Sequence, residues 1–128
     1  MTLPAESELR KKIPIMTGFI DYFPLAIAYG AMISYLGNQK HNPGEPLHWS
    51  REKSADHVDC IGRHLIDRKQ EDGGVLEAGQ VFWRAGAQLQ LLLEHLQAKG
   101  VDIWAPIRTE AVRNTGQPSS ADDERLKR

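Results

Sequence analysis

The sequence predicts an all-α protein, a small helical bundle of three to four helices, with a Pro/Gly-rich loop between the first and second helices. Three observations support this. Three segments place apolar residues at helical spacing, each segment ends at a helix-stopping signal, and a run with two prolines separates the first two. The chain has 128 residues, which indicates one domain.

The first helix is expected from about Tyr22 to Leu36. Pro24 suits its first turn, where the missing N–H costs no hydrogen bond, and Gly37-Asn38 is a typical helix stop. Before it, residues 1–12 are polar and predicted to be flexible, and residues 13–22 are interpreted as a short strand or an extended lead-in. Residues 13–108 then form a single helical domain.

The second helix is expected to begin after Ser54, a good N-cap, and to run to about Arg68. The third helix spans about residues 75–99 and stops at Gly100. Its apolar residues cover more than half of its circumference, which favours self-association into a homo-oligomer. Residues 109–128 are polar and predicted to be a disordered tail.

The overall composition is typical of a soluble globular protein. Apolar residues make up 41% and charged residues 26% of the chain, with a formal net charge of −1, so general nucleic-acid binding is not expected. No segment has the length of a membrane span or the core of a signal peptide, and we expect a cytoplasmic protein. Cys60 is the sole cysteine, so no intrachain disulfide forms.

The second helix offers a candidate metal site. On a helical wheel, Val58, Ile61 and Leu65 fall on one side, and the other side holds two acids and an arginine, Asp56, Asp59 and Arg63. Carboxylates spaced by three suit Mg²⁺ or Mn²⁺, and the arginine suits a phosphate. The alternative is an ordinary solvated helix face with weak ion pairs, which is the commoner explanation of such a pattern.

Two further residue types are candidates for ligand contacts. The histidines at 41, 48, 57 and 64 cluster in the chain, but no Cys pair or H-E-x-x-H motif accompanies them, so zinc is disfavoured. Trp49 and Trp83 both adjoin a basic residue, in "HWSR" and "FWRA", and a stacking surface beside arginine suits a nucleobase and its phosphates. Equally, the two indoles could simply close a thin helical core.

The stretch "LGNQKHNPGEPLHWSREKSADHVDCIGRHLIDR", followed by "VFWRA", resembles a phage and prophage family, the dATP/dGTP diphosphohydrolase N-terminal domain. The resemblance runs from about Arg10 to Leu96. It implies hydrolysis of purine deoxynucleoside triphosphates to the monophosphate and pyrophosphate, akin to the MazG-like all-α pyrophosphohydrolases that use Mg²⁺. On this basis Asp59, His64 and Glu77 are the catalytic candidates, and Asp56 and Asp59 the metal ligands. The residues assigned to a purine nucleotide substrate are Asn38, His41, His48, Trp49, Lys53, Arg63, Trp83 and Arg84.

The sequence departs from the MazG-like pattern in its acids. The first helix has no acid between Pro24 and Asn38, and Asp56 and Asp59 stand in place of an E-x-x-E pair. A missing ligand weakens metal binding. Three functions therefore remain open: a metal-dependent hydrolase, a protein that holds a nucleotide without cleaving it, and a helical oligomerisation module. We also expect the loop over residues 37–54 to pack on the second helix, with His48 and Trp49 beside a pocket that holds both acids.

Overall fold

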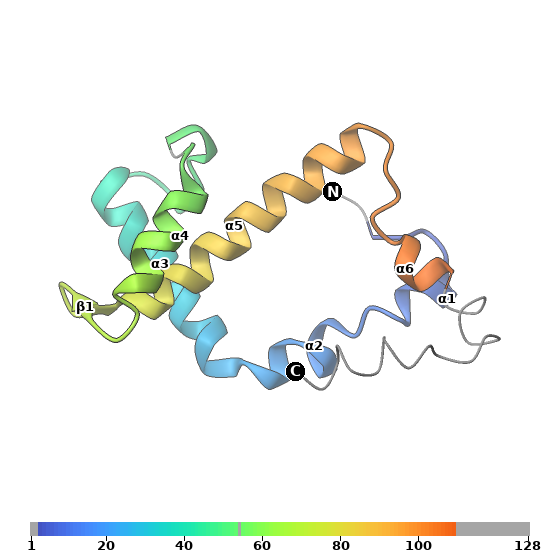
Figure 1. The fold of residues 1–128 in the computed structure, drawn as a ribbon, viewed down its shortest axis with the longest axis horizontal. Coiled ribbons are helices and arrows are strands. Elements are labelled where there is room, and N and C mark those ends of the chain that lie inside the picture. The colour runs from blue at the N-terminus through green and yellow to red at the C-terminus, as the bar shows by residue number, and fades with distance from the viewer. Residues whose placement is uncertain (1–2, 54, 110–128) are drawn as a thin grey trace. The chain divides into compact units, whose positions relative to one another are not determined.

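The computed structural model describes residues 3–53 and 55–109, and it confirms a small, mostly α-helical fold (Figure 1). The predicted tail and the proposed cap at residue 54 lie outside the described residues, apart from Thr109. The chain divides into two compact units, each of which is described by itself below. One contains residues 3–14 and 95–109 of the described part, and the other contains Ile15–Glu94.

The smaller unit joins the two ends of the described chain. It contains α1 (Ser7–Arg10) and α6 (Ala105–Arg108). Arg108 holds them together: its Nη1 lies 3.0 Å from Glu6 Oε1 and its Nε lies 2.8 Å from Asp102 Oδ2. The long helix α5 (Glu77–Ala98) ends here as expected, because Gly100 adopts a φ of 80° and stops it.

The larger unit contains the candidate site. Two helical turns, α2 (Ile15–Gly18) and the 3₁₀ helix η1 (Ile20–Tyr22), precede α3 (Pro24–His41), so the expected strand or extended lead-in over residues 13–22 is wrong. Pro24 occupies the first turn of α3, as predicted. The remaining elements are η2 (Arg51–Lys53), α4 (His57–Ile66), β1 (Glu71–Asp72), β2 (Val75–Leu76) and the part of α5 up to Glu94.

Helices α3 and α5 approach closely where glycine leaves room. A Cβ atom on Gly79 would lie 2.7 Å from a ring atom of Tyr29 and 2.8 Å from Ile33, so a larger residue cannot fit without displacement. A Cβ atom on Gly30 would likewise lie 3.2 Å from a ring atom of Phe82 on α5. The apolar core is thin. Among the described residues of the larger unit, only three apolar side chains are buried: Ile33, Cys60 and Ala87.

The predicted end of the first helix is wrong. Helix α3 continues through Gly37 and Asn38 to His41, because Asn38 is buried and its side chain bonds to the loop that follows the helix. Its Nδ2 donates to the carbonyl of Glu45 at 3.1 Å, and its Oδ1 accepts a hydrogen bond from Asn42 at 3.2 Å. The helix ends at Asn42, directly before Pro43, which has no N–H to continue it.

The third helix begins later than predicted because a hairpin precedes it. Strands β1 and β2 pair antiparallel, with Glu71 opposite Leu76 and Asp72 opposite Val75. Gly73 and Gly74 connect them with φ values of 59° and 83°, as a two-residue turn with left-handed backbone requires. Val75 and Leu76 therefore belong to the hairpin, and α5 starts at Glu77.

Helix α4 turns its apolar side outward. It starts at His57 after the N-cap residue Asp56, and it ends at Ile66, two residues short of the prediction. His57 and Cys60 are buried, with 4% and 8% of their surface exposed, whereas Val58 is 65% exposed. The face that packs against the rest of the unit thus carries imidazole and thiol groups.

Among the described residues, no single helix is long and apolar enough to cross a membrane.

Candidate functional site

A cavity of about 970 Å³ opens where α3, the loop after it, α4, the hairpin and α5 meet. Most of the ligand-binding and catalytic residues predicted from the sequence line it. They are Asn38, His41, His48, Trp49, Lys53, Asp56, His64, Glu77, Trp83 and Arg84. Asp59 and Arg63 are not among the lining residues, and both are exposed on α4. The cavity therefore unites residues from five segments of the chain, but only one of the two predicted metal ligands.

The loop between α3 and α4 is fastened by a polar network around Asn42. The side chain of Asn42 is buried, and its Oδ1 accepts hydrogen bonds from Lys53 Nζ at 2.8 Å and Ser50 Oγ at 3.3 Å. Lys53 also donates to the carbonyl of His41 at 3.2 Å. Lys53 and Asn38 thus stabilise the loop in the folded protein, in addition to the ligand contacts that the resemblance assigns to them.

His48 is held within the same loop. Its Nδ1 lies 2.9 Å from the carbonyl of Pro46, so this nitrogen carries the proton, and its Nε2 lies 3.2 Å from Ser50 Oγ. The ring is half exposed at the cavity. Glu45 Oε2 also lies 3.4 Å from Nε2, so contacts on both ring nitrogens hold the imidazole in one orientation beside the cavity.

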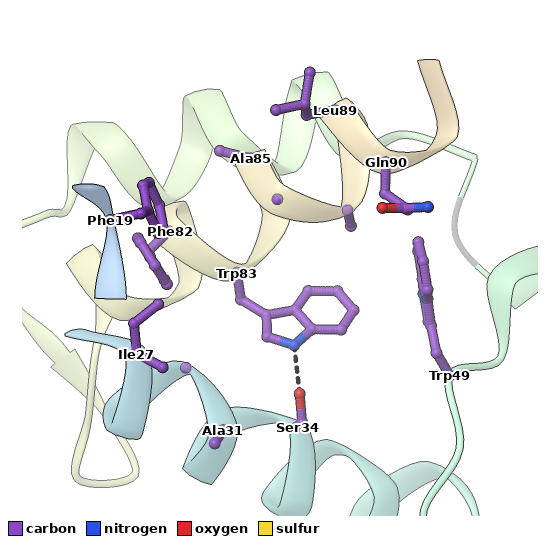
Figure 2. A pocket seen from close by; sticks show the side chains of 13 residues that line it. Phe19, Ile27, Ala31, Ser34, Trp49, Phe82, Trp83, Ala85, Leu89 and Gln90 are labelled. Carbon is purple, nitrogen blue, oxygen red and sulfur yellow. Dashed lines mark hydrogen bonds between the residues drawn. The ribbon is translucent and has the colours of Figure 1, made fainter. Parts of the chain in front are cut away.

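The two tryptophans of the site contact each other. Their rings meet edge to face, with centroids 5.9 Å apart and an interplanar angle of 82°, and Figure 2 shows the edge of Trp83 directed at the face of Trp49. Arg51 lies over Trp49, 4.4 Å from the ring centroid, and its Nη1 lies 2.7 Å and 2.6 Å from the two carboxylate oxygens of Glu94. These contacts favour the structural interpretation of Trp49 over base stacking.

Trp83 also separates two cavities. Together with Ser34 and Trp49 it lines both the polar cavity and an apolar one of about 620 Å³ (Figure 2). The apolar cavity lies along α3 and α5, and its other lining residues include Phe19, Ile27, Phe82 and Leu89. The indole N–H of Trp83 donates to Ser34 Oγ at 2.6 Å, so the wall between the cavities is hydrogen-bonded across the two helices.

A buried histidine lies beside the arginine of the site. His57 Nδ1 lies 3.2 Å from Arg84 Nη1, and arginine can only donate, so Nδ1 is the acceptor. Burial lowers the pKa of His57, the neighbouring Arg84 lowers it further, and Asp56 opposes them. The imidazole is therefore neutral at pH 7 with its proton on Nε2. That nitrogen is buried and has no hydrogen-bond partner among the described residues.

His64 and Glu77 form the second histidine contact at the cavity. His64 Nδ1 and Glu77 Oε2 are hydrogen-bonded, and both side chains are largely buried. The pair joins α4 to the first turn of α5. A carboxylate that orients an imidazole is the arrangement found in general acid–base catalysis, because it fixes the ring and its tautomer. These are two of the three catalytic candidates from the sequence; the third, Asp59, lies outside the cavity.

The structure places the two acids predicted to bind Mg²⁺ or Mn²⁺ in different surroundings, since Asp56 lines the cavity and Asp59 does not. Asp56 Oδ2 accepts a hydrogen bond from Arg63 Nη2 at 3.1 Å, and Cys60 Sγ lies 3.5 Å from Asp56 Oδ1. Asp59 is exposed. Within residues 3–53 and 55–109, no group of three or more His, Cys, Asp or Glu side chains is placed to share a metal ion.

Comparisons with models of protein families, with curated proteins and with solved structures found no significant match for this chain. The family resemblance of the loop and α4 thus remains an expectation from the sequence.

The sequence pattern assigned no role to two residues of the site, His57 and Asn42. His57 is spaced with Cys60 and His64 at helical intervals of three and four, and this pattern of one shared face was available in the sequence. Asn42 precedes Pro43 at the end of a helix, a position where asparagine side chains commonly form local hydrogen bonds.

Proposed function

We propose that this protein binds a purine nucleotide in the polar cavity and holds it without cleaving it. The observation that supports this proposal most directly is the gathering of Lys40, Lys53 and Arg84 with imidazole and aromatic side chains around one cavity of about 970 Å³. Ligand pockets usually measure about 300–1,000 Å³, so a nucleotide fits this size. Basic side chains at a pocket wall attract phosphate.

The chemistry of the lining assigns different parts of the cavity to different parts of the ligand. Arg84 extends from α5 beside His57 and carries a permanent positive charge, which suits a phosphate group. Asp72 and Glu77 line the cavity at the hairpin and at the start of α5. Carboxylates repel phosphates and accept hydrogen bonds from hydroxyl groups, so these two acids suit the sugar.

The second candidate function is the hydrolysis implied by the resemblance, in which a deoxynucleoside triphosphate and water give the monophosphate and pyrophosphate. The contact between His64 and Glu77 favours it, since such a pair can accept a proton from water. The position of Asp59 outside the cavity weighs against it, and so does the pairing of Asp56 with Arg63. We therefore place binding before hydrolysis.

Thermal melts with added nucleotide test the proposal. A ligand that binds only the folded state stabilises it by about 2.7 kcal/mol at one hundred times its Kd, so dATP or dGTP should raise the Tm. The rise should occur with and without Mg²⁺, and chromatography of the nucleotide after incubation should show no monophosphate. Release of monophosphate and pyrophosphate that requires Mg²⁺ would favour the hydrolase instead.

A matched pair of arginine variants ties the binding to the cavity. Arg84→Gln removes the charge that faces the cavity and should abolish most of the shift in Tm. Arg68→Gln removes an arginine near the end of α4 that does not line it and should leave the shift unchanged. Equal shifts in wild type and Arg84→Gln, or no shift at millimolar nucleotide, would overturn the proposal.

A further inference from the structure

Helix α4 presents a continuous apolar arc to solvent. Val58, Leu65 and Ile66 are 65%, 48% and 79% exposed, and Gly62 lies between them. At about 100° per residue these four positions fall within an arc of about 100°, on the side of the helix opposite Cys60. An amphipathic helix ordinarily turns such an arc toward a core, so this one requires another surface to cover it.

The orientation of α4 is fixed by its polar contacts. His57 is bonded to Arg84 and His64 to Glu77, and both partners lie on α5. Rotating α4 to bury Val58 would break both contacts and expose Cys60, which is buried. Within the described chain the apolar arc therefore stays exposed while the cavity keeps its form.

We propose that a second copy of this chain covers the arc, with the two α4 helices antiparallel and crossing at Gly62. In such a pair Val58 packs against Ile66 of the partner subunit, and the reverse contact forms by symmetry. A two-fold interface uses the same patch on both copies, so every contact occurs twice. The proposal is independent of the ligand in the cavity.

The charges beside the arc favour a second copy over an unrelated partner. Asp59 and Arg63 lie one helical turn apart and border the arc on the same edge. Two antiparallel copies bring these edges together in reverse order, so Asp59 lies within reach of Arg63 of the partner subunit, twice. Asp59 has no ion pair among the described residues, whereas Arg63 already contacts Asp56. A patch with this order of charges is complementary to itself.

Gly62 suits the crossing point. A Cβ atom placed there would meet nothing within 4 Å, so no neighbour in the fold requires a glycine. Glycine in a helix interior is unfavourable relative to alanine. A glycine at a helix crossing allows the two backbones to approach closely, because the distance between axes depends on the side chains at the contact.

Light scattering after size-exclusion chromatography provides the first test. The wild type should show twice the monomer mass of 14.4 kDa at micromolar concentration. Val58→Asp should return it to the monomer mass, raising the dissociation constant about tenfold or more, since central apolar contacts carry most of an interface. Leu25→Asp, at a residue 85% exposed on α3, is the matched control and should remain dimeric. A monomeric wild type, or a dimer lost only in the control, overturns the proposal.

Charge reversal tests the reciprocal pair. Asp59→Arg and Arg63→Asp should each weaken the dimer, because each places like charges together across the two-fold axis. The double variant restores opposite charges and should recover the wild-type dissociation constant. An antiparallel pair in this register would be excluded if both single variants kept the wild-type dissociation constant. It would also be excluded if the double variant dimerised more weakly than either single variant.

Cysteine cross-linking tests the crossing point directly. Gly62→Cys should give a disulfide-linked dimer under mild oxidation, visible on non-reducing gels. Gly86→Cys is the control, because Gly86 also has open space around it but lies on α5. A disulfide-linked dimer of Gly86→Cys alone would place the interface elsewhere. The same conclusion would follow if neither variant formed the disulfide although the protein was dimeric.

Discussion

Trp83 Nε1 donates a hydrogen bond to Ser34 Oγ at a distance of 2.6 Å and so connects α5 to α3. Both residues line the polar cavity and the apolar one (Figure 2). Few apolar side chains are buried in the described part of the chain, so this hydrogen bond adds to the close α3–α5 contacts at Gly30 and Gly79. The shape of the candidate site depends on this contact.

Replacing Trp83 by Phe should therefore destabilise the protein. The variant keeps an aromatic ring but loses the donor, which leaves Ser34 without this partner and costs about 1 kcal/mol or more in the free energy of unfolding. Chemical denaturation measures it. Trp104→Phe is the matched control, because the indole nitrogen of Trp104 is buried without a hydrogen-bond partner among the described residues. A larger decrease in the free energy of unfolding for Trp104→Phe than for Trp83→Phe would contradict this expectation.

Gly37→Ala should stabilise the protein. Gly37 lies inside α3, does not have a positive φ, and has open space where a Cβ atom would be placed. Alanine is better than glycine in a helix interior by about 0.5–1 kcal/mol. The comparison is Gly74→Ala, in the hairpin turn, where φ is 83°. There alanine is strained, and a loss of about 1 kcal/mol is expected.

The same pair of variants distinguishes the observed end of α3 from the predicted one. If the helix stopped at Gly37 in a left-handed conformation, alanine at position 37 would destabilise the protein as it does at position 74. Thermal melts of both variants beside wild type show the sign of each change. A lower Tm for Gly37→Ala would mean that α3 ends where the sequence alone suggested.

The error at Gly37 shows what local sequence signals leave undetermined. Gly37-Asn38 is a common helix stop, and so is Asn42-Pro43 five residues later. The choice between them depends on Asn38, whose side chain bonds to the loop that returns over the helix. That loop contact is tertiary, and no local rule predicts it. The all-α class and the Gly100 stop were predictable because they depend on periodicity and backbone conformation.

The residues of the candidate site were predictable in part from the sequence. The resemblance singled out residues of α3, the loop after it, α4 and α5, and the fold brings ten of them to one cavity. The direction of α4 was not predictable from its periodicity, since apolar patterning favours burial of Val58 and Leu65. Contacts of His57 and His64 with α5 decide the direction instead.

The free energy of unfolding should depend on pH through His57. Burial and Arg84 lower its pKa in the folded protein below the ordinary value of about 6.5. The unfolded chain then binds more protons than the folded protein near and below pH 6.5. The contribution of His57 to the free energy of unfolding is therefore fully present above that pH and is lost as the pH falls toward the folded pKa. Denaturation at a series of pH values should show this decline in wild type.

His57→Gln removes the titrating group and should flatten the decline between about pH 7.5 and about pH 5.5. Glutamine keeps an oxygen that can accept the hydrogen bond from Arg84, so the fold is expected to survive. His95→Gln, at an exposed histidine on α5, is the matched control. A decline that persists unchanged in His57→Gln would show that other groups govern the acid side of the stability curve.

The last prediction separates the two acids that the sequence assigned to a metal. Asp56 bonds to Arg63 at the N-terminus of α4, whereas Asp59 is exposed, so Asp56→Asn should lower the Tm and Asp59→Asn should change it little. A shared metal site predicts a different pattern. Removing either carboxylate would relieve repulsion without metal, and millimolar Mg²⁺ or Mn²⁺ would raise the Tm of wild type but of neither variant. Melts of the three proteins with and without each ion decide between these patterns. A metal-dependent rise in Tm confined to wild type would mean that Asp59 and Asp56 act together and that α4 changes its conformation to bind the ion.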